Sequence, residues 1–361
     1  MKETMKLLLL PGDGIGPEIT EAARVVLDAA RLRFGFPLEL QLDEIGFAAL
    51  ERHGTTLRDA TIELAEAADG VILGPVSHNS YPPLAEGGHN PSGVLRKRLD
   101  LYANIRPARS RPGIATPTGR PMDLVIVREN TEGFYADRTM VTGTGEFMPT
   151  EDLALAIRKV TARGSQRIAE QAFALAARRR RKVTAVHKAN VLRVSDGLFL
   201  DRVRAVAGAN PATEYKEELV DAMAAYLIRA PERFDVIVTT NMFGDILSDE
   251  ASELAGGLGL AASLNAGEEH AMAQAQHGSA PDIAGQGVAN PVSLILSVAM
   301  LLDWLAARGG DHRLADAART IERAVDTCLE DGAARTPDLG GSGTTDSFAA
   351  ETARLVADLP S

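Results

Sequence analysis

Short runs of apolar residues alternate with longer segments in which apolar residues recur at helical spacing. The short runs predict buried strands at residues 7–10, 70–73, 124–127, 183–186 and 236–238. The helical spacing predicts helices at residues 18–33, 57–68, 165–180 and 290–307. Because the two kinds of element alternate along the chain, the pattern predicts an α/β fold with a largely parallel sheet.

Two segments interrupt this alternation. Residues 139–150 repeat Thr and Gly, which predicts a loop or a protruding hairpin that could serve as a dimerising arm. Residues 261–280 are irregular and rich in Gly, His and Gln, which predicts a long loop. Long loops in compact enzymes usually serve a functional site.

The length and charge of the chain narrow the class of protein. A chain of 361 residues exceeds what one hydrophobic core usually organises, which predicts two domains. With 38 basic and 49 acidic residues the net charge is −11, which disfavours nucleic acid and anionic membranes as partners. The only cysteine is Cys328, so an intrachain disulfide is excluded and a reducing compartment fits.

No segment reads as a signal peptide or a membrane span. The first ten residues contain only a four-leucine run, and the apolar stretch at residues 292–302 stops at an aspartate, well short of the length of a bilayer span. We therefore expect a cytoplasmic protein without a membrane partner.

Residues 12–18, with the sequence GDGIGPE, follow the first predicted strand and open the first predicted helix. Backbone amides at such a position can face a phosphate or a sugar of a cofactor. The glycines are spaced G-x-G-x-G rather than G-x-G-x-x-G, so the usual dinucleotide-binding fingerprint is not met. A tight turn that needs small residues explains the motif equally well.

Three aspartates are candidate metal ligands. Asp245 and Asp249 follow a strand and are four residues apart, so a helix places both carboxylates on one face. Two adjacent carboxylates repel one another unless a cation lies between them, and hard oxygen ligands suit Mg²⁺ or Mn²⁺. Solvated helix charges would explain an isolated pair as well. Asp221, in an otherwise apolar segment where an unpaired carboxylate is costly to bury, favours the metal.

Candidate acid, base and clamp residues follow other strands. Lys188 lies at the end of a strand and could act as a general base, although most lysines are surface residues. Tyr135 ends the motif RENTEGFY and could donate a proton. Arg96, Arg106 and Arg128 lie in three separate segments, and guanidinium groups suit a substrate with several carboxylates, although each arginine alone could form a surface ion pair.

Residues 277–285, HGSAPDIAG, are assigned to the adenosine half of a cofactor. Asp282 could accept hydrogen bonds from ribose hydroxyls, and it would repel a 2′-phosphate. The sequence therefore predicts NAD rather than NADP.

Six motifs in order resemble those of the metal-dependent β-decarboxylating dehydrogenases, which include isopropylmalate, isocitrate, homoisocitrate and tartrate dehydrogenases. They lie at residues 12–18, 99–107, 128–135, 187–190, 244–249 and 277–285. The resemblance spans essentially the whole chain, and the middle region looks closest to homoisocitrate dehydrogenases.

The resemblance implies an isopropylmalate dehydrogenase-like fold without a classic Rossmann cofactor site. A large cofactor-side domain would comprise residues 1–102 and 254–361. A small dimerisation domain would comprise residues 103–253, with an arm near residues 136–151. The active site would lie in the cleft between the domains and would be completed by a second subunit of a homodimer or higher oligomer.

Roles for the site residues also follow from the resemblance. Arg96, Arg106 and Arg128 would hold the substrate carboxylates, and Asp245 and Asp249 would bind the metal together with Asp221 of the partner subunit. The partner subunit's Lys188 would take the hydroxyl proton, and Tyr135 would protonate the enol left after CO₂ departs. The residues expected to contact NAD are Ile15, Asn190, His277, Gly278, Ser279, Ala280, Asp282, Ile283 and Asn290.

The implied activity is the NAD-dependent oxidative decarboxylation of a 3-substituted (2R)-malate. Members of the family commonly carry a glutamate three residues before the loop histidine, where this chain has Gln274. In isopropylmalate enzymes leucines precede the first arginine, whereas here Asn90, Ser92 and Gly93 occupy that turn. Gly93 also occupies the position at which homoisocitrate dehydrogenases share an arginine.

These departures predict a γ-substituent that is polar or very small, with isocitrate-, homoisocitrate-, tartrate- and malate-like acids all open. A 3-isopropylmalate dehydrogenase is one alternative. A catalytically silent regulatory subunit of the same family is another, against which the complete set of acid, base and metal residues argues. An ordinary Rossmann 2-hydroxy-acid dehydrogenase is disfavoured by the glycine spacing and by the three acids.

Overall fold

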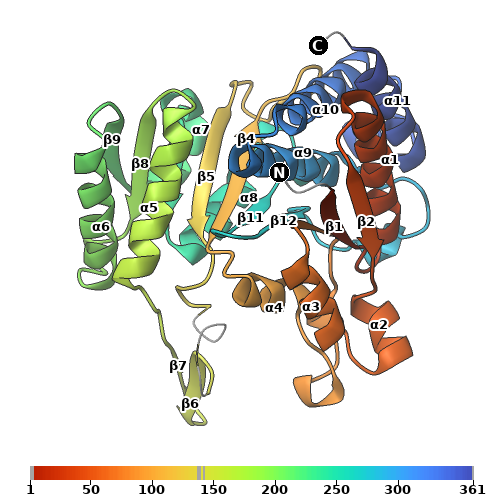
Figure 1. Ribbon diagram of the computed structural model, residues 1–361. Coiled ribbons are helices and arrows are strands. Elements are labelled where there is room, and N and C mark those ends of the chain that lie inside the picture. The colour runs from red at the N-terminus through yellow and green to blue at the C-terminus, as the bar shows by residue number, and fades with distance from the viewer. Residues whose placement is uncertain (1–3, 136–139, 141–142, 360–361) are drawn as a thin grey trace.

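A computed structural model describes residues 4–135, 140 and 143–359 (Figure 1). The strands are β1 (Met5–Leu10), β2 (Leu38–Leu42), β3 (Gly70–Leu73), β4 (Ala103–Arg109), β5 (Asp123–Glu129), β6 (Glu146–Thr150), β7 (Leu153–Ala156), β8 (Lys182–His187), β9 (Glu214–Leu219), β10 (Val236–Thr239), β11 (Leu264–Ala266) and β12 (Ala271–Gln274). The helices are α1 (Gly16–Phe34), α2 (Gly46–His53), α3 (Asp59–Ala67), α4 (Pro91–Arg98), α5 (Ala162–Ala177), α6 (Ser195–Ala209), α7 (Val220–Arg229), α8 (Asn241–Ala255), α9 (Val292–Gly309), α10 (His312–Asp331) and α11 (Thr345–Asp358).

Within the described residues ten strands form one sheet, in the order β2-β1-β3-β12-β11-β4-β5-β10-β8-β9. The four strands at each end of this order pair in parallel, whereas β11 and β4 pair antiparallel with their neighbours and join the two parallel blocks. The predicted α/β fold with a largely parallel sheet is therefore confirmed.

Helices cover both faces of the sheet, which is why strands such as β3 and β10 are buried along their whole length. One large core cluster lies under α1, α9, α10 and α11 at one end of the sheet and under α5 and α6 at the other (Figure 1). On the opposite face one cluster packs under α3 and α4, and another under α7 and α8. Helices α1, α9, α10 and α11 also pack against one another through their apolar stripes.

Helix α9 spans residues 292–309, two residues later at each end than predicted. It continues past Asp303 to Gly309, and its 18 residues are long and apolar enough to cross a membrane by length and composition alone. Most of that stretch is buried inside the protein, where it contacts α10 and β12. The helix is thus a central core element of this fold.

The prediction of a long loop at residues 261–280 was wrong. This segment contains β11 and β12, and β12 pairs in parallel with β3 near the middle of the sheet. The strands are only three and four residues long, which is too short to show a clear apolar periodicity. Their pairing partners, not their own pattern, make them strands.

A hairpin protrudes from the body of the molecule, as the Thr and Gly repeats indicated. Strands β6 and β7 form a separate antiparallel pair, and in Figure 1 they project away from the large sheet. Residues 136–139 and 141–142 of the expected arm lie outside the described residues. Hydrogen bonds between β4 and β11 make the sheet continuous between the two expected domains, and the division of the chain into those domains stays a prediction.

Candidate functional site

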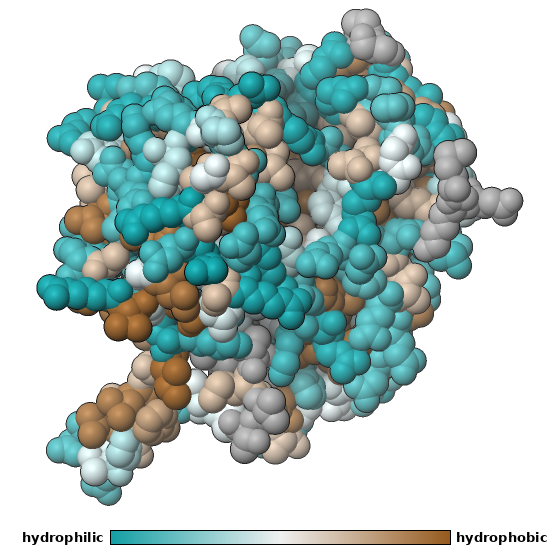
Figure 2. All heavy atoms as spheres, turned by 60° about the vertical axis from the view of Figure 1, so that its left-hand side comes forward, coloured by the Kyte–Doolittle hydropathy of each residue, from teal (hydrophilic) through white to brown (hydrophobic). Residues whose placement is uncertain are grey.

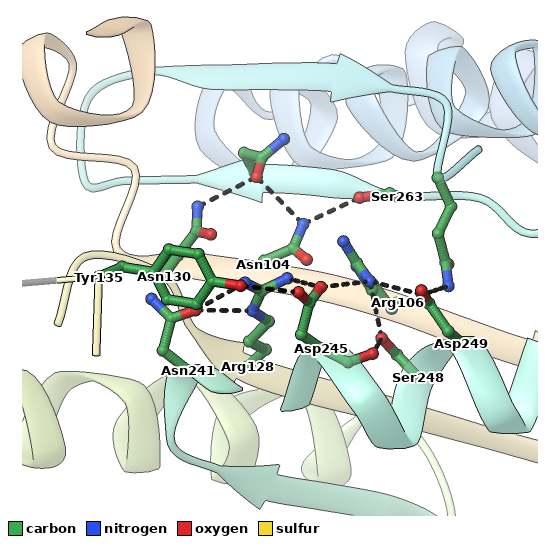
Figure 3. Close-up of polar contacts among 12 residues, drawn as sticks. Asn104, Arg106, Arg128, Asn130, Tyr135, Asn241, Asp245, Ser248, Asp249 and Ser263 are labelled. Carbon is green, nitrogen blue, oxygen red and sulfur yellow. Dashed lines mark hydrogen bonds and ion pairs between the residues drawn. The ribbon is translucent and has the colours of Figure 1, made fainter. Parts of the chain in front are cut away.

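Helix α8 carries two carboxylates on one face, directly after strand β10. Asp245 and Asp249 are one helical turn apart, and both approach the guanidinium of Arg106 on β4 (Figure 3). Arg106 Nη1 lies 3.3 Å from Asp245 Oδ1 and 3.0 Å from Asp249 Oδ1, and it donates to Ser248 Oγ at 2.8 Å. The helix thus brings the two acids together, as their spacing predicted.

A second arginine reaches the same aspartate from the neighbouring strand. Arg128 on β5 is 2% exposed, donates to Asn241 Oδ1 at 3.0 and 2.6 Å, and forms an ion pair with Asp245. A Cβ atom at Gly244 would lie 2.6 Å from Arg128 Cβ. A glycine at position 244 is therefore what lets α8 approach β5 closely enough for this ion pair.

Tyr135 joins the cluster from the segment that follows β5. Its hydroxyl donates to Asp245 Oδ2 at 3.1 Å, and the Arg128 guanidinium lies 5.6 Å from the centre of its ring. A proton donor, two arginines and two carboxylates thus meet at one place (Figure 3). These five residues are called the α8 cluster below: Arg106, Arg128, Tyr135, Asp245 and Asp249.

The charges of the α8 cluster shift the pKa values of its members. Burial raises the pKa of Asp245, but the positive charges of Arg128 and Arg106 outweigh burial, so the net shift is downward. Burial, together with the charge of Arg128, lowers the pKa of Arg106 to about 10. The cluster is therefore held as compensating ion pairs, with the carboxylate of Asp245 ionised.

Helix α4 carries the third arginine and the turn predicted to select the substrate. Arg96 Nη2 and Ser92 Oγ both donate to Gln274 Oε1, each at 3.0 Å. Asn90 is the N-cap of this helix, because its side-chain oxygen accepts from Gly93 N at 3.1 Å. The charge of Arg96 also contributes to lowering the pKa of Asp245, so α4 and the α8 cluster share an electrostatic environment.

Lys188 and Asp221 form a separate pair. Lys188 Nζ lies 2.6 Å from Asp221 Oδ1, and this hydrogen bond lowers the pKa of Asp221. The Lys188 backbone amide donates to Asp196 Oδ2 at 2.6 Å, which holds the chain at the end of β8. The expected burial of Asp221 among its apolar neighbours was wrong: at the start of α7 its side chain is 64% exposed.

The described residues do not gather three acidic, histidine or cysteine side chains closely enough to hold a metal ion. Asp245 and Asp249 are together on α8, whereas Asp221 belongs to the pair with Lys188. The chemistry of Asp245 and Asp249 suits a hard divalent cation, whose other coordination positions must be filled by water, substrate or a second chain.

The two motifs predicted to bind the cofactor contact each other. Ile15 N donates to Ser279 O at 2.9 Å, and the Ser279 hydroxyl lies 2.7 Å from that of Ser77. Gly14 has a φ of 59°, and a Cβ atom there would lie 1.9 Å from Ser279 O. The glycine motif and the HGSAPDIAG segment therefore form one continuous backbone surface.

The other predicted cofactor residues lie in three places. Near this surface, His277 Nδ1 lies 2.9 Å from Gly278 O, and burial lowers the pKa of His277. Ala280, Asp282 and Ile283 belong to a short 3₁₀ turn, on which Asp282 is exposed. Asn290 accepts from Val292 N at 3.0 Å and so organises the start of α9. Asn190 is exposed on the turn after β8, beside Lys188.

Several residues contribute to the site without having been predicted. Gln276 Nε2 donates to Asp249 Oδ1 at 2.7 Å, and Asn241 orients Arg128. Asp13 accepts from Phe47 N and Ser77 N, both at 2.8 Å, and so holds the loop beside Ser279. Asp13 belongs to the glycine motif already singled out and Asn241 lies three residues before the motif at residues 244–249, whereas nothing in the expected loop marked Gln276.

The chain is similar to known proteins over nearly its whole length. The family model described as "Isocitrate/isopropylmalate dehydrogenase" matches residues 6–353. The isocitrate/homoisocitrate dehydrogenase of Thermus thermophilus is 46% identical over 345 residues, covering 95% of this chain and 96% of that protein. The 3-isopropylmalate dehydrogenase of Sulfurisphaera tokodaii is 41% identical, covering 94% and 95% respectively.

A solved structure agrees with these sequence relatives. The isocitrate dehydrogenase of Methylococcus capsulatus superposes with a TM-score of 0.86 at 42% identity, covering 98% of this chain and 100% of that chain. The match in sequence and in fold extends across essentially the full length of both proteins. The chain therefore belongs to the isocitrate/isopropylmalate dehydrogenase family of decarboxylating dehydrogenases.

Proposed function

We propose that this protein catalyses the NAD-dependent oxidative decarboxylation of a 3-substituted (2R)-malate with a polar or small γ-substituent, using Mg²⁺ or Mn²⁺. The observation that carries the proposal is the α8 cluster, in which Asp245 contacts Arg106, Arg128 and Tyr135. One hydrogen-bonded group thereby contains a candidate metal ligand, the arginines that could hold the substrate carboxylates, and a candidate proton donor.

The donor set fits a divalent cation. Asp245 and Asp249 would hold it in this chain, and Asp221 of the partner subunit would supply a third carboxylate. When bound, such a cation acts as a Lewis acid toward the substrate hydroxyl and the ketone derived from it. Arg106 and Arg128 would then release the aspartates and form ion pairs with the substrate carboxylates instead.

Proton transfer is assigned to Lys188 and Tyr135. Tyr135 Oη donates to Asp245 Oδ2, which holds its proton at the edge of the α8 cluster. Lys188 and Asp221 are paired with one another and Asp221 is exposed, as expected of groups that serve the site of a second subunit. A homodimer or higher homo-oligomer with shared sites is therefore part of the proposal.

The protruding arm supports this dimer. Figure 2 shows apolar side chains gathered on the arm, and five large hydrophobic residues there are at least 41% exposed: Phe147, Met148, Leu153, Leu155 and Ile157. Exposed apolar surface of this kind usually marks an interface. The arm is therefore one expected contact, and the part of the body that carries Lys188 and Asp221 must also approach the partner for the site to be shared.

NAD and a cytoplasmic location are proposed on separate grounds. Exposed Asp282 stands next to the surface made by Ile15 and Ser279, where its carboxylate can accept from ribose hydroxyls and repel a 2′-phosphate.

A single cysteine, buried at position 328, suits a reducing compartment.

The substrate preference rests on α4. Ser92, Arg96 and Gln274 form a hydrogen-bonded polar group. An isopropyl substituent placed against them would gain little from burial and would separate polar groups from their partners. The names of the relatives from Thermus thermophilus and Methylococcus capsulatus also favour an isocitrate- or homoisocitrate-like acid. The 41% identical relative named for 3-isopropylmalate makes that acid the second candidate.

The test is a steady-state comparison of isocitrate, homoisocitrate, tartrate, D-malate and 3-isopropylmalate, each with NAD or NADP in the presence of Mn²⁺. We expect one CO₂ released per NADH formed, higher kcat/KM with NAD, and no turnover after exhaustive chelation. Turnover without metal, or NADH formed without CO₂, would contradict the reaction class. The highest kcat/KM for 3-isopropylmalate would establish the second candidate, and no turnover of any acid would support a regulatory subunit.

A further inference from the structure

We propose that Gln276 is a positioning residue, which orients the carboxylate of Asp249 for a divalent cation through an uncharged hydrogen-bond donor. The inference rests on the proposed function and deepens it, because it names a residue outside the α8 cluster that would set the affinity for the metal. Gln276 lies between the end of β12 and the HGSAPDIAG segment, where the two parts of the site meet.

The backbone at Gln276 is anchored on the core. Gln276 follows the last residue of β12 by two positions, and its amide donates to Ser293 Oγ on α9 at 3.2 Å. Ser293 is fully buried, and its hydroxyl donates to the carbonyl of Ala261. The side chain of Gln276 therefore starts from a well-packed part of the fold and reaches across to α8.

The Gln276 side chain contacts two successive turns of α8. Its Nε2 donates to Asp249 Oδ1 at 2.7 Å and to Ser252 Oγ at 3.1 Å. The Ser252 hydroxyl donates to Ser248 O at 2.7 Å, so its single hydrogen is already used and it can only accept from Gln276. The carboxylate of Asp249 also only accepts. Both contacts therefore require the nitrogen, and this requirement fixes the orientation of the amide.

The oxygen of the same amide shows that packing alone does not favour glutamine at this position. Gln276 Oε1 is buried, and among the residues that the structure describes it has no hydrogen-bond partner. A buried carbonyl oxygen without a partner lowers the stability of a fold, and an apolar side chain of similar length would avoid that cost. The hydrogen bond to Asp249 is what glutamine supplies and an apolar side chain cannot.

Asp249 Oδ1 accepts from two donors that differ in charge. Arg106 Nη1 lies 3.0 Å from this oxygen (Figure 3), whereas Gln276 Nε2 is neutral. The Asp249 side chain is 52% exposed, so its orientation depends on these donors. A guanidinium reduces the negative charge that a cation would meet, and an amide leaves that charge intact. If Arg106 turns to a substrate carboxylate, Gln276 is the donor that continues to orient Asp249.

The test measures Mn²⁺ binding to the intact protein directly, from the electron paramagnetic resonance signal of free Mn²⁺ in titrations without substrate. Methionine keeps the length of the side chain and removes the donor, so in Gln276→Met we expect the Kd for Mn²⁺ to rise about tenfold, as is typical when a residue that orients a metal ligand is lost. Gln276→Lys restores a donor but adds a competing positive charge, so we expect the Kd to rise at least as much.

The matched control is Gln41→Met. Gln41 is exposed on β2, the strand at the end of the sheet order, so the same chemical change there should alter the Kd for Mn²⁺ less than about twofold. If Gln276→Met does not fold, Gln276→Asn supplies the measurement, because it keeps the amide and shortens its reach by one methylene. The Kd is again expected to rise.

A second readout separates positioning from a general loss of structure. In Gln276→Met the Mn²⁺ concentration that gives half-maximal activity should rise about tenfold. The kcat at saturating Mn²⁺ and the Kd for NADH, measured by fluorescence without metal, should change less than about threefold. A structural role alone would impair Mn²⁺ binding, NADH binding and kcat together.

The outcomes separate this inference from the proposed function. Wild-type affinity for Mn²⁺ in Gln276→Met or in Gln276→Lys, or equal losses in all three measurements, would overturn the inference while the decarboxylating activity stands. A wild-type protein that binds no Mn²⁺ would instead overturn the metal-dependent reaction of the proposed function itself.

Discussion

At the scale of single residues, the most demanding group in the site is the buried guanidinium of Arg128. Isolated burial of a charge is costly, and it is tolerated when the charge is paired and hydrogen-bonded. Asn241 and Asp245 meet this requirement from the first turns of α8. The charged site is therefore also part of the packing between α8 and β5. The geometry of the site and the stability of the fold thus depend on the same contacts.

Gly244→Ala is expected to disturb the geometry of the site and to lower the stability of the fold. The new methyl carbon would lie 2.6 Å from Arg128 Cβ, so α8 must move away from β5 or Arg128 must leave its position. We expect destabilisation of about 1–3 kcal/mol, typical of overpacking, measured by urea unfolding, together with a loss of activity. Gly208→Ala on α6 is the control: nothing lies within 4 Å of its Cβ position, and removing a helical glycine should stabilise by about 0.5–1 kcal/mol. Equal stability of Gly244→Ala and wild type would show that the helix has room to shift.

At the scale of elements, the sheet ends in β9, an edge strand rich in charged side chains. Arg204 on α6 donates to both carboxylate oxygens of Glu217 on β9, each at 2.8 Å, and Tyr215 Oη donates to the same carboxylate at 2.9 Å. Charged side chains on an edge strand discourage pairing with another sheet. The bidentate contact also joins α6 to the strand at the end of the sheet order, beside β8.

This contact should appear in the pH dependence of stability. The hydrogen bond from Arg204 lowers the pKa of Glu217 below its usual 4.5. A carboxyl group with a lowered folded-state pKa stabilises the protein above the unfolded pKa, and this contribution is lost as the pH falls through the folded pKa. At pH 7 Glu217→Gln should therefore reduce the free energy of unfolding by up to about 1 kcal/mol, the usual range for a partly exposed pair.

Chemical denaturation of Glu217→Gln, Arg204→Gln and the double variant at several pH values tests this expectation. The coupling between the two substitutions should be present at pH 7 and should disappear once wild-type Glu217 is protonated. A difference between variant and wild type that is the same in acid and at neutral pH would assign the effect to packing rather than to charge.

At the scale of the whole molecule, one chain holds two partial sites. The α8 cluster and the pair of Lys188 with Asp221 are formed by different elements, and no hydrogen bond or ion pair between them is found within the described residues. Symmetric dimers can complete such sites twice, because each subunit gives to its partner what it receives. The exposed arm is expected to contribute to this association.

Subunit exchange tests this arrangement. Lys188→Ala and Tyr135→Phe should each be inactive or nearly so, but a mixed dimer would hold one site with both groups intact. Random exchange of equal amounts makes about half of the dimers mixed, so about a quarter of wild-type activity should return. Mass spectrometry of the mixture establishes that exchange has occurred. Mixed dimers without activity would place Lys188 and Tyr135 in the site of the same chain.

The sequence by itself determined what depends on local periodicity. Alternating apolar runs and helical spacing were sufficient for the α/β class. The four-residue spacing of Asp245 and Asp249 placed both on one face of a helix, because neighbours on a helix surface are set by its own geometry. The motifs that resemble a known family also located most residues of the site, since each motif is a short continuous segment.

Only the tertiary structure decided what depends on partners distant in the chain. Strands β11 and β12 were not recognised, because a segment of three or four residues becomes a strand only when β4 and β3 lie beside it. In the same way, the exposure of Asp221 and its pairing with Lys188, and the meeting of Gln274 with Arg96, could not be predicted. Hydrogen bonds and ion pairs between distant segments form when packing brings those segments together. Such contacts cannot be inferred from the spacing of residues along the chain.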